Sequence, residues 1–116
     1  MSQRRNPAAR LQAPVFAALG DPIRLQLLDR LSSGEPISIS ALAQGSQVTR
    51  QAVTKHLRVL EDVSLVRSTR QGRCTLFTFT PEPIIGLREF LDLVARHWDE
   101  RLGRLKSLVE APDGET

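Results

Sequence analysis

The chain of 116 residues has few of the features that export, membrane insertion or catalysis require. Its single cysteine, Cys74, excludes an internal disulfide and fits a reducing cytoplasm. No apolar run approaches the ~18 residues of a membrane span, and no apolar signal segment stands at the N-terminus. The sequence has no glycine loop that could cradle phosphate and no nucleophile with a neighbouring base. We therefore expect a cytoplasmic protein that is not an enzyme, binds no cofactor and does not enter a membrane.

What the chain does have is positive charge concentrated in one segment. A length of 116 residues and a hydrophobic content of 41% suit a single soluble domain with a modest core. Residues 49–73 hold six cations and two acids, a net charge of +4, whereas the whole chain carries +3. The cations are Arg50, Lys55, Arg58, Arg67, Arg70 and Arg73. Such a cluster suits a polyanionic partner such as a nucleic acid.

The segment from Ile39 to Leu60 predicts two helices joined by a tight turn. The first helix is short and ends at Gly45, and the hydroxyl of Thr49 can cap the second helix. The second helix has one apolar face, formed by Val53, Leu57 and Leu60. Its other face carries side chains that can bind base edges and phosphates: Gln51, Thr54, Lys55 and Arg58. This layout is typical of a helix-turn-helix.

Two β-prone runs, Leu65–Arg70 and Cys74–Phe79, follow the second helix. Gln71 and Gly72 lie between them, and glycine permits the positive φ of a tight hairpin. Three arginines gather on or beside the hairpin tip: Arg67, Arg70 and Arg73. We expect Cys74 to be a small buried residue of the strand, although the neighbouring arginine leaves a redox role open.

The last predicted element is a helix from Thr80 to Val109, with Thr80 as its cap and Pro81 and Pro83 in its first turn. Its apolar residues recur at steps of three and four, close to a heptad seam: Leu87, Leu91, Val94, Trp98, Leu102, Leu105 and Val109. A helix of about 40 Å is too long for so small a domain to cover. We expect part of this stripe to pack on the protein's own core and the rest on a second subunit.

The N-terminal third predicts a polar tail and two helices. The tail carries Arg4, Arg5 and Arg10, and is either solvated or an arm that touches phosphate. A short helix from Pro14 to Leu19 should follow and end at Gly20. Asp21 should cap the next helix with Pro22 at its first position. The core stripe of that helix is Ile23, Leu27, Leu28 and Leu31.

Together these motifs resemble the ArsR family of bacterial winged helix-turn-helix repressors. The resemblance rests on Phe16–Leu31, Ala41–Val66 and Arg70–Phe79, which stand in the order and at the spacing of that family. It implies a homodimeric repressor that binds a near-palindromic operator in double-stranded DNA. The alternative is a winged-helix module for RNA or protein contact. Such a module should lack a dimer helix and need not carry cations on both helix and hairpin.

The predicted fold class is mainly α with a small β-hairpin, a winged helix-turn-helix that dimerises through a long C-terminal helix. We expect a flexible tail (1–12), the DNA-binding domain (13–80), the dimerisation helix (81–110) and a disordered tail (111–116). The predicted DNA contacts are Thr49, Arg50, Gln51, Thr54, Lys55, His56, Arg58, Arg70, Gln71 and Arg73. The predicted dimer contacts are Leu87, Leu91, Val94, Trp98, Leu102 and Leu105. His56 lies nearer the buried stripe, so it either bonds locally or, as the resemblance implies, touches the DNA backbone.

The two metal sites of metal-sensing family members are not expected. Those members have a Cys-x-Cys pair where this chain has Ser38 and Ser40, and a serine hydroxyl is a poor ligand for soft metals. Their second pattern is Asp-x-His followed by His-x-x-Glu. His97 begins a match to its second half, but Ile84 and Gly86 replace the first two ligands. We therefore predict a non-metal-sensing member, and no residue pattern identifies an inducer.

Overall fold

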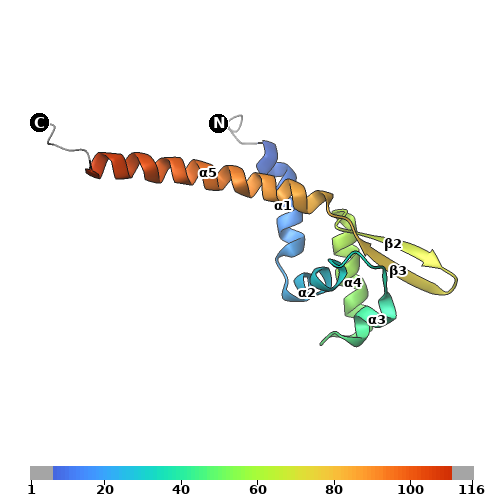
Figure 1. The fold of residues 1–116 in the computed structure, drawn as a ribbon. Coiled ribbons are helices and arrows are strands. Elements are labelled where there is room, and N and C mark those ends of the chain that lie inside the picture. The colour runs from blue at the N-terminus through green and yellow to red at the C-terminus, as the bar shows by residue number, and fades with distance from the viewer. Residues whose placement is uncertain (1–6, 111–116) are drawn as a thin grey trace, which may run out of the picture.

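The computed structural model describes residues 7–110, which form five helices and a three-stranded sheet; two of the strands project from the body as a hairpin, and one helix extends far from the body (Figure 1). In chain order the elements are α1 (Pro7–Leu19), α2 (Pro22–Leu31), β1 (Ile37–Ser38), α3 (Ile39–Gln44), α4 (Arg50–Asp62), β2 (Val66–Gln71), β3 (Cys74–Phe79) and α5 (Glu82–Glu110). The arrangement is a winged helix-turn-helix: α3 and α4 form the helix-turn-helix, and β2 with β3 forms the wing. The predicted fold class is confirmed.

One apolar core lies where all five helices meet the base of the sheet. Its most shielded side chains are Leu31, Leu42, Val53, Leu57, Leu60 and Leu65. Four of them, Leu31, Val53, Leu57 and Leu60, belong to the stripes that helical periodicity predicts for α2 and α4. Two of the predicted caps, Asp21 and Thr49, are confirmed. Thr49 Oγ1 accepts from the Ala52 amide at 3.1 Å, and Asp21 Oδ2 accepts from the Ile23 and Arg24 amides at 2.9 and 3.1 Å.

Helix α1 is longer than the sequence indicates. It begins at Pro7 rather than Pro14, so the expectation of a flexible tail is wrong for residues 7–12, and residues 1–6 lie outside the described part. Pro14 lies inside the helix, where a proline removes one backbone hydrogen bond. Packing on α5 offsets that deficit: the rings of Phe16 and Phe90 meet edge to face, with centroids 6.2 Å apart.

The sheet contains a short strand that the sequence does not indicate. Strand β1 pairs antiparallel with β3, and Ile37 lies opposite Phe77, so the strand order is β1-β3-β2. A strand of two residues is too short to produce an alternating pattern of apolar and polar residues. The sequence therefore does not distinguish this strand from the connector that precedes it. The strand ties the start of α3 to the wing.

The end of α4 is a local turn, and a contact that is distant in sequence joins this turn to the segment before α5. The Leu65 amide donates to the Leu60 carbonyl at 2.9 Å, and Ser64 adopts a left-handed φ of 63°, which is a Schellman end for α4. The Thr80 hydroxyl donates to the Ser64 carbonyl. Thr80 is therefore not the cap of α5 as predicted, and that helix begins at Glu82. The bond instead holds the end of the wing to the turn after α4.

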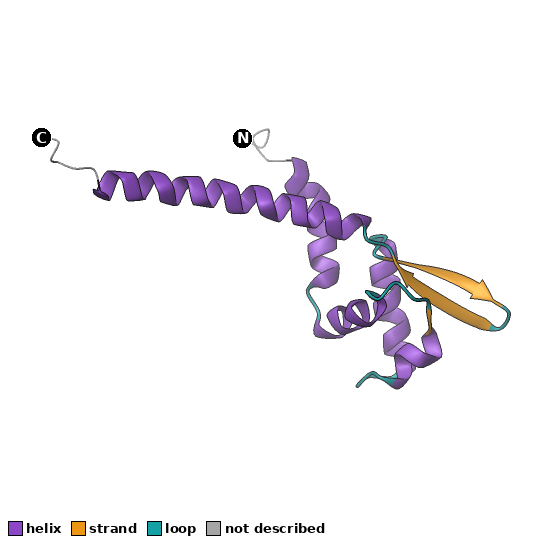
Figure 2. Ribbon diagram, viewed as in Figure 1, coloured by secondary structure: helices purple, strands orange, loops and turns teal. Residues whose placement is uncertain are grey.

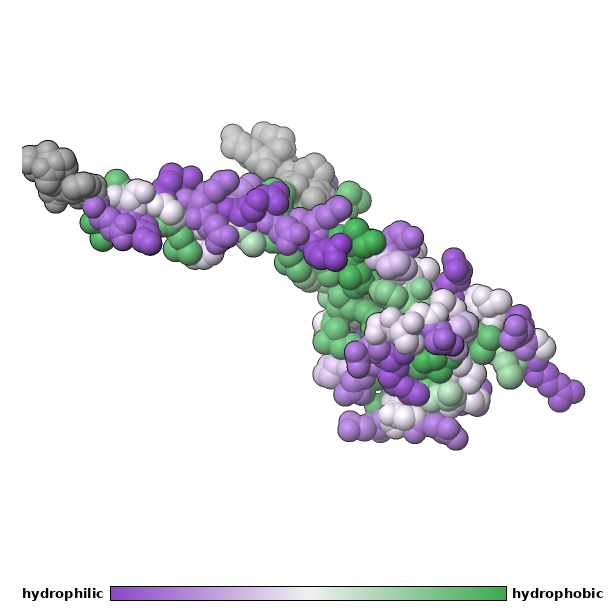
Figure 3. Space-filling view, viewed as in Figure 1, coloured by the Kyte–Doolittle hydropathy of each residue, from purple (hydrophilic) through white to green (hydrophobic). Residues whose placement is uncertain are grey.

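The molecule is extended because its longest element leaves the body. Figure 2 shows α5 running away from the body on one side while the wing projects on the other. Apolar side chains gather where α5 meets the body and continue along one edge of that helix (Figure 3). None of the helices in residues 7–110 is both long and apolar enough to cross a bilayer.

Candidate nucleic-acid interface

Helix α4 turns a polar face outward. Gln51, Thr54, Lys55 and Arg58 line one shallow groove on the surface, as their helical spacing predicts. The Thr54 hydroxyl donates to the Arg50 carbonyl at 3.0 Å, so its lone pairs stay available to an outside donor. The other three side chains are exposed, and together they offer two cations and an amide.

The wing adds cations from a second element. Gln71 pairs with Cys74, so the hairpin turn contains only Gly72, whose φ is 62°, and Arg73. Side chains that lie directly opposite in a ladder share a face. Arg70, which pairs with Thr75, therefore shares the face of Ser68 and Phe77.

The positive charge of these two elements is not neutralised internally. Among the described residues, none of the six cations between positions 49 and 73 forms an ion pair with a carboxylate. All six side chains are exposed. An exposed cluster without internal partners keeps its field available to a polyanion.

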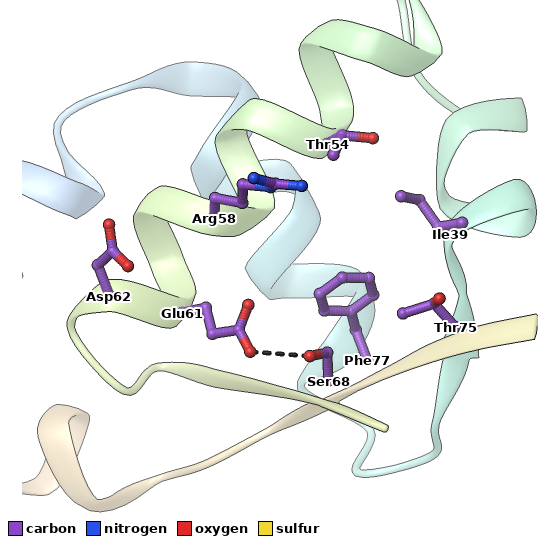
Figure 4. Close-up of a pocket in the computed structure, with 8 residues that line it drawn as sticks. All are labelled: Ile39, Thr54, Arg58, Glu61, Asp62, Ser68, Thr75 and Phe77. Atoms are coloured by element: carbon purple, nitrogen blue, oxygen red, sulfur yellow. Dashed lines mark hydrogen bonds between the residues drawn. The ribbon is translucent and has the colours of Figure 1, made fainter. Parts of the chain in front are cut away.

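A groove runs between α4 and the wing, and Figure 4 shows its lining. Thr54 and Arg58 border it from α4, and Ser68 and Thr75 border it from the strands, with Phe77 between them. The Ser68 hydroxyl donates to Glu61 at 2.8 Å. This hydrogen bond links α4 to the wing across the groove that both elements line.

Cys74 does not fit its predicted environment. We expected a small buried residue, but the side chain is exposed. The wing extends beyond the core, and at the tip both faces of the hairpin meet solvent. A strand pattern indicates alternation but does not indicate where the core beneath the sheet ends.

His56 lies apart from the polar face of α4. Its side chain is 22% exposed, and its Nδ1 is 3.1 Å from Nη1 of Arg24 and 3.8 Å from Oδ2 of Asp21. Hydrogen bonds from the amides of Arg24 and Ile23 lower the pKa of Asp21, because they stabilise its charged form. The local hydrogen bond expected as one possibility for His56 is present, and its contact with DNA stays a prediction.

The apolar stripe of α5 divides into two parts. Leu87 is only 6% exposed and belongs to the core, so its assignment to a subunit contact is wrong. The next five stripe residues keep 45–57% of their surface exposed: Leu91, Val94, Trp98, Leu102 and Leu105. Large apolar side chains at such exposure, continuous along one helix, mark an interaction surface.

The positions that hold metal in the resembled family have other roles here. The Ser38 hydroxyl accepts from the Ala41 amide at 3.1 Å and caps α3. A Cβ on Gly86 would lie 3.2 Å from Nε2 of Gln12, so α1 covers that position. His97 is exposed. Within residues 7–110 no three His, Cys, Asp or Glu side chains are grouped so that they could hold a metal ion.

Comparison with known proteins identifies the family. The helix-turn-helix domain family matches residues 19–69. YuzN, a helix-turn-helix-type transcriptional regulator of Bacillus subtilis, is 39% identical over 79 residues, which cover 63% of this chain and 86% of the relative. The solved structure of an ArsR-like transcriptional regulator from Rhodococcus sp. RHA1 is 33% identical, with a TM-score of 0.76 over 89% of this chain and 96% of that one. The chain belongs to the ArsR family of winged helix-turn-helix transcriptional regulators.

A third comparison concerns assembly in this family. The ArsR-family regulator resembles the homodimeric winged helix-turn-helix DNA-binding domain of Mb0332 from Mycobacterium bovis. The two chains are 26% identical with a TM-score of 0.62, and the match covers 83% of this chain and 88% of that one. The predicted family is confirmed, and with it a role in transcription regulation.

Proposed function

We propose that this ArsR-family regulator is a homodimeric repressor that binds a near-palindromic operator in double-stranded DNA. The observation that carries the proposal is the exposed, unpaired cationic surface shared by α4 and the wing. Phosphate contacts from cations supply affinity, whereas amide and guanidinium groups can distinguish base edges in the major groove. Gln51 and Arg58 supply such groups on α4.

In this mechanism the exposed half of the α5 stripe joins two subunits. Covering Leu91, Trp98 and Leu102 removes apolar surface from water, and the homodimeric M. bovis relative supports the same assembly. Each subunit then places α4 in a major groove, while Arg70, Gln71 and Arg73 reach the flanking backbone or minor groove. The half-sites lie one helical turn apart, or a multiple of it.

Occupancy of the operator represses transcription because the bound dimer excludes polymerase from the same DNA. The protein acts in the cytoplasm, needs no cofactor and catalyses no reaction. We also propose that metal does not control it, since Ser38 caps α3 and Gln12 covers Gly86. A module for RNA or protein contact alone is disfavoured, because both α4 and the wing expose cations and α5 exposes an apolar stripe.

The test is binding of the purified protein to labelled duplexes tiled across the DNA upstream of its own gene. We expect one duplex to be shifted at nanomolar protein against excess unlabelled random DNA, since specific sites exceed random DNA by at least about a thousandfold. An RNA duplex of the same sequence serves as the matched competitor. Equal competition by that RNA, or equal binding to every tile, would contradict operator recognition.

A further inference from the structure

Arg24 connects three helices through one guanidinium group. Its Nε donates to the Ala18 carbonyl, its Nη2 donates to the Ala17 carbonyl at 3.3 Å, and its Nη1 lies 3.1 Å from Nδ1 of His56. Ala17 and Ala18 lie in the last turn of α1, where backbone carbonyl groups have no amide donor within the helix. Arg24 itself belongs to α2, and His56 belongs to α4.

The contact between Arg24 and His56 has a defined direction. A guanidinium group can only donate, so Nδ1 of His56 is the acceptor. Oδ2 of Asp21 lies 3.8 Å from the same nitrogen and is held in place by the amides of Ile23 and Arg24. An Nδ1 that accepts from Arg24 has no proton to give to that carboxylate, so Arg24 is the partner that holds His56.

Helix α1 continues this connection to α5. Phe16 packs edge to face on Phe90, and Gln12 lies over Gly86. The same α5 carries the exposed apolar stripe. A chain of direct contacts thus runs from the surface proposed to join the subunits, through α1 and Arg24, to the helix proposed to enter the DNA.

We propose that Arg24 and His56 are positioning residues that fix the orientation of α4 relative to the dimer axis and so select the spacing between operator half-sites. This inference rests on the proposed function. Inserting one base pair moves a half-site by about 3.4 Å along the DNA and also rotates it. A rigidly held α4 rejects the altered site, whereas a loosely held α4 tolerates it. On this account His56 acts through Arg24 and not by touching phosphate.

The experiment begins with the operator duplex that the wild-type protein selects from a randomised library. Binding is then measured to that duplex and to versions with one central base pair added or removed, at several salt concentrations. We expect His56→Ala and Arg24→Lys each to lower the preference for the selected spacing about tenfold, the effect of removing one hydrogen bond to a charged group. The slope of log affinity against log salt should not change.

Two further variants separate positioning from general disruption of the structure. In His56→Asn the amide oxygen can replace Nδ1 as the acceptor, so spacing preference should return. Arg30 is the matched control, because it ties α2 to α3 by donating to the Leu42 and Ala41 carbonyls at 2.9 and 3.0 Å. We expect Arg30→Lys to lower thermal stability but to keep the spacing preference.

The three outcomes can be distinguished. If His56→Ala weakens binding at every spacing alike and lowers the salt slope, the histidine contacts phosphate and the inference is wrong. An unchanged spacing preference in a folded His56→Ala protein would also overturn it, and the proposed function would stand. If the wild-type protein enriches no duplex at all, the proposed function is wrong, and the inference that rests on it is wrong as well.

Discussion

Helix α4 with the wing and the outer part of α5 are both exposed, but they expose opposite kinds of chemistry. The first surface is cationic and polar, and none of its cations is paired with a carboxylate in the described chain. The second is a continuous apolar stripe from Leu91 to Leu105. Unpaired charge is matched by a polyanion, whereas apolar surface is matched by another apolar surface. The difference supports our proposal that the two surfaces bind two different partners, DNA and a second copy of the chain.

The two surfaces also differ in how they are supported. Helix α4 is held by a buried face, by the cap at Thr49 and by hydrogen bonds to Arg24 and Ser68 through His56 and Glu61. The outer part of α5 has no such support within the described protomer, where every side chain from position 94 onward is exposed. The surface proposed to contact DNA therefore has fixed geometry in one protomer, whereas the apolar surface would be covered only by the proposed partner subunit.

The largest expected effect comes from placing a charge in the apolar stripe. Trp98→Glu should convert the dimer to a monomer, because an unpaired carboxylate buried in an apolar seam costs about 3–5 kcal/mol. DNA affinity should fall at least about a hundredfold, since each monomer then holds only one half-site. Sedimentation equilibrium and operator binding measure the two effects.

Ser107→Glu is the matched control, because position 107 lies on the side of α5 opposite Trp98 and receives the same added charge. It should sediment as a dimer and bind the operator normally. If Trp98→Glu sediments at the dimer mass, the stripe is not the subunit interface. A monomeric mutant with unchanged operator affinity would separate the two surfaces and remove the need for a dimer.

The next effect divides the cationic surface into its two elements. Gln51→Ala should relax the preference at one base pair per half-site, because a bidentate amide contact contributes about 1–3 kcal/mol of discrimination. Arg73→Ala should weaken all sequences alike and lower the slope of log affinity against log salt by about one for each phosphate that the arginine no longer neutralises. Each substitution serves as the control for the other, in binding assays on single-base operator variants at several salt concentrations. The opposite pattern would assign sequence recognition to the wing and backbone contact to the helix.

Local periodicity explains why so much of the fold was predictable. The stripes of α2 and α4, the caps at Asp21 and Thr49 and the hairpin turn at Gly72 all depend on residues within a few positions of one another. A sequence reveals such relations directly.

Most of the wrong or missing predictions depend on contacts between distant segments, whereas Cys74 was misassigned because the core does not extend beneath the tip of the wing. Helix α1 extends to Pro7 because it lies against α5, and β1 exists because β3 pairs with it. Thr80 serves the turn after α4 instead of capping α5. The contact partner of His56 is Arg24, which is 32 positions earlier in the chain. The helical wheel placed this histidine near the buried stripe, and that was the only signal the sequence held.

A smaller effect concerns the acid beside the groove. Glu61→Gln removes one negative charge next to the proposed DNA path but keeps an oxygen that can accept from Ser68. Operator affinity should rise about threefold, because two like charges near a protein surface repel by less than about 1 kcal/mol once salt screens them. Glu89→Gln, on α5, is the control with the same chemical change and should leave affinity unaltered. Affinity that stays the same or falls in Glu61→Gln would place the DNA backbone away from this groove.

The smallest expected effect is none: Zn(II), Cd(II) and As(III) should leave operator affinity unchanged. Soft metals need thiolate or imidazole ligands. Ser38 and Ser40 offer hydroxyl groups, and that of Ser38 is already engaged with the Ala41 amide. On α5, Gly86 supplies no side chain and is covered by Gln12, so His97 lacks the ligands that would complete a site. Operator binding is titrated after dialysis against chelator, with each metal added in turn, and the metal content of the protein is measured in parallel. One tightly held metal ion per subunit together with release of DNA would contradict this prediction. It would show that other residues bind the metal and that the protein is a metal-sensing member of its family.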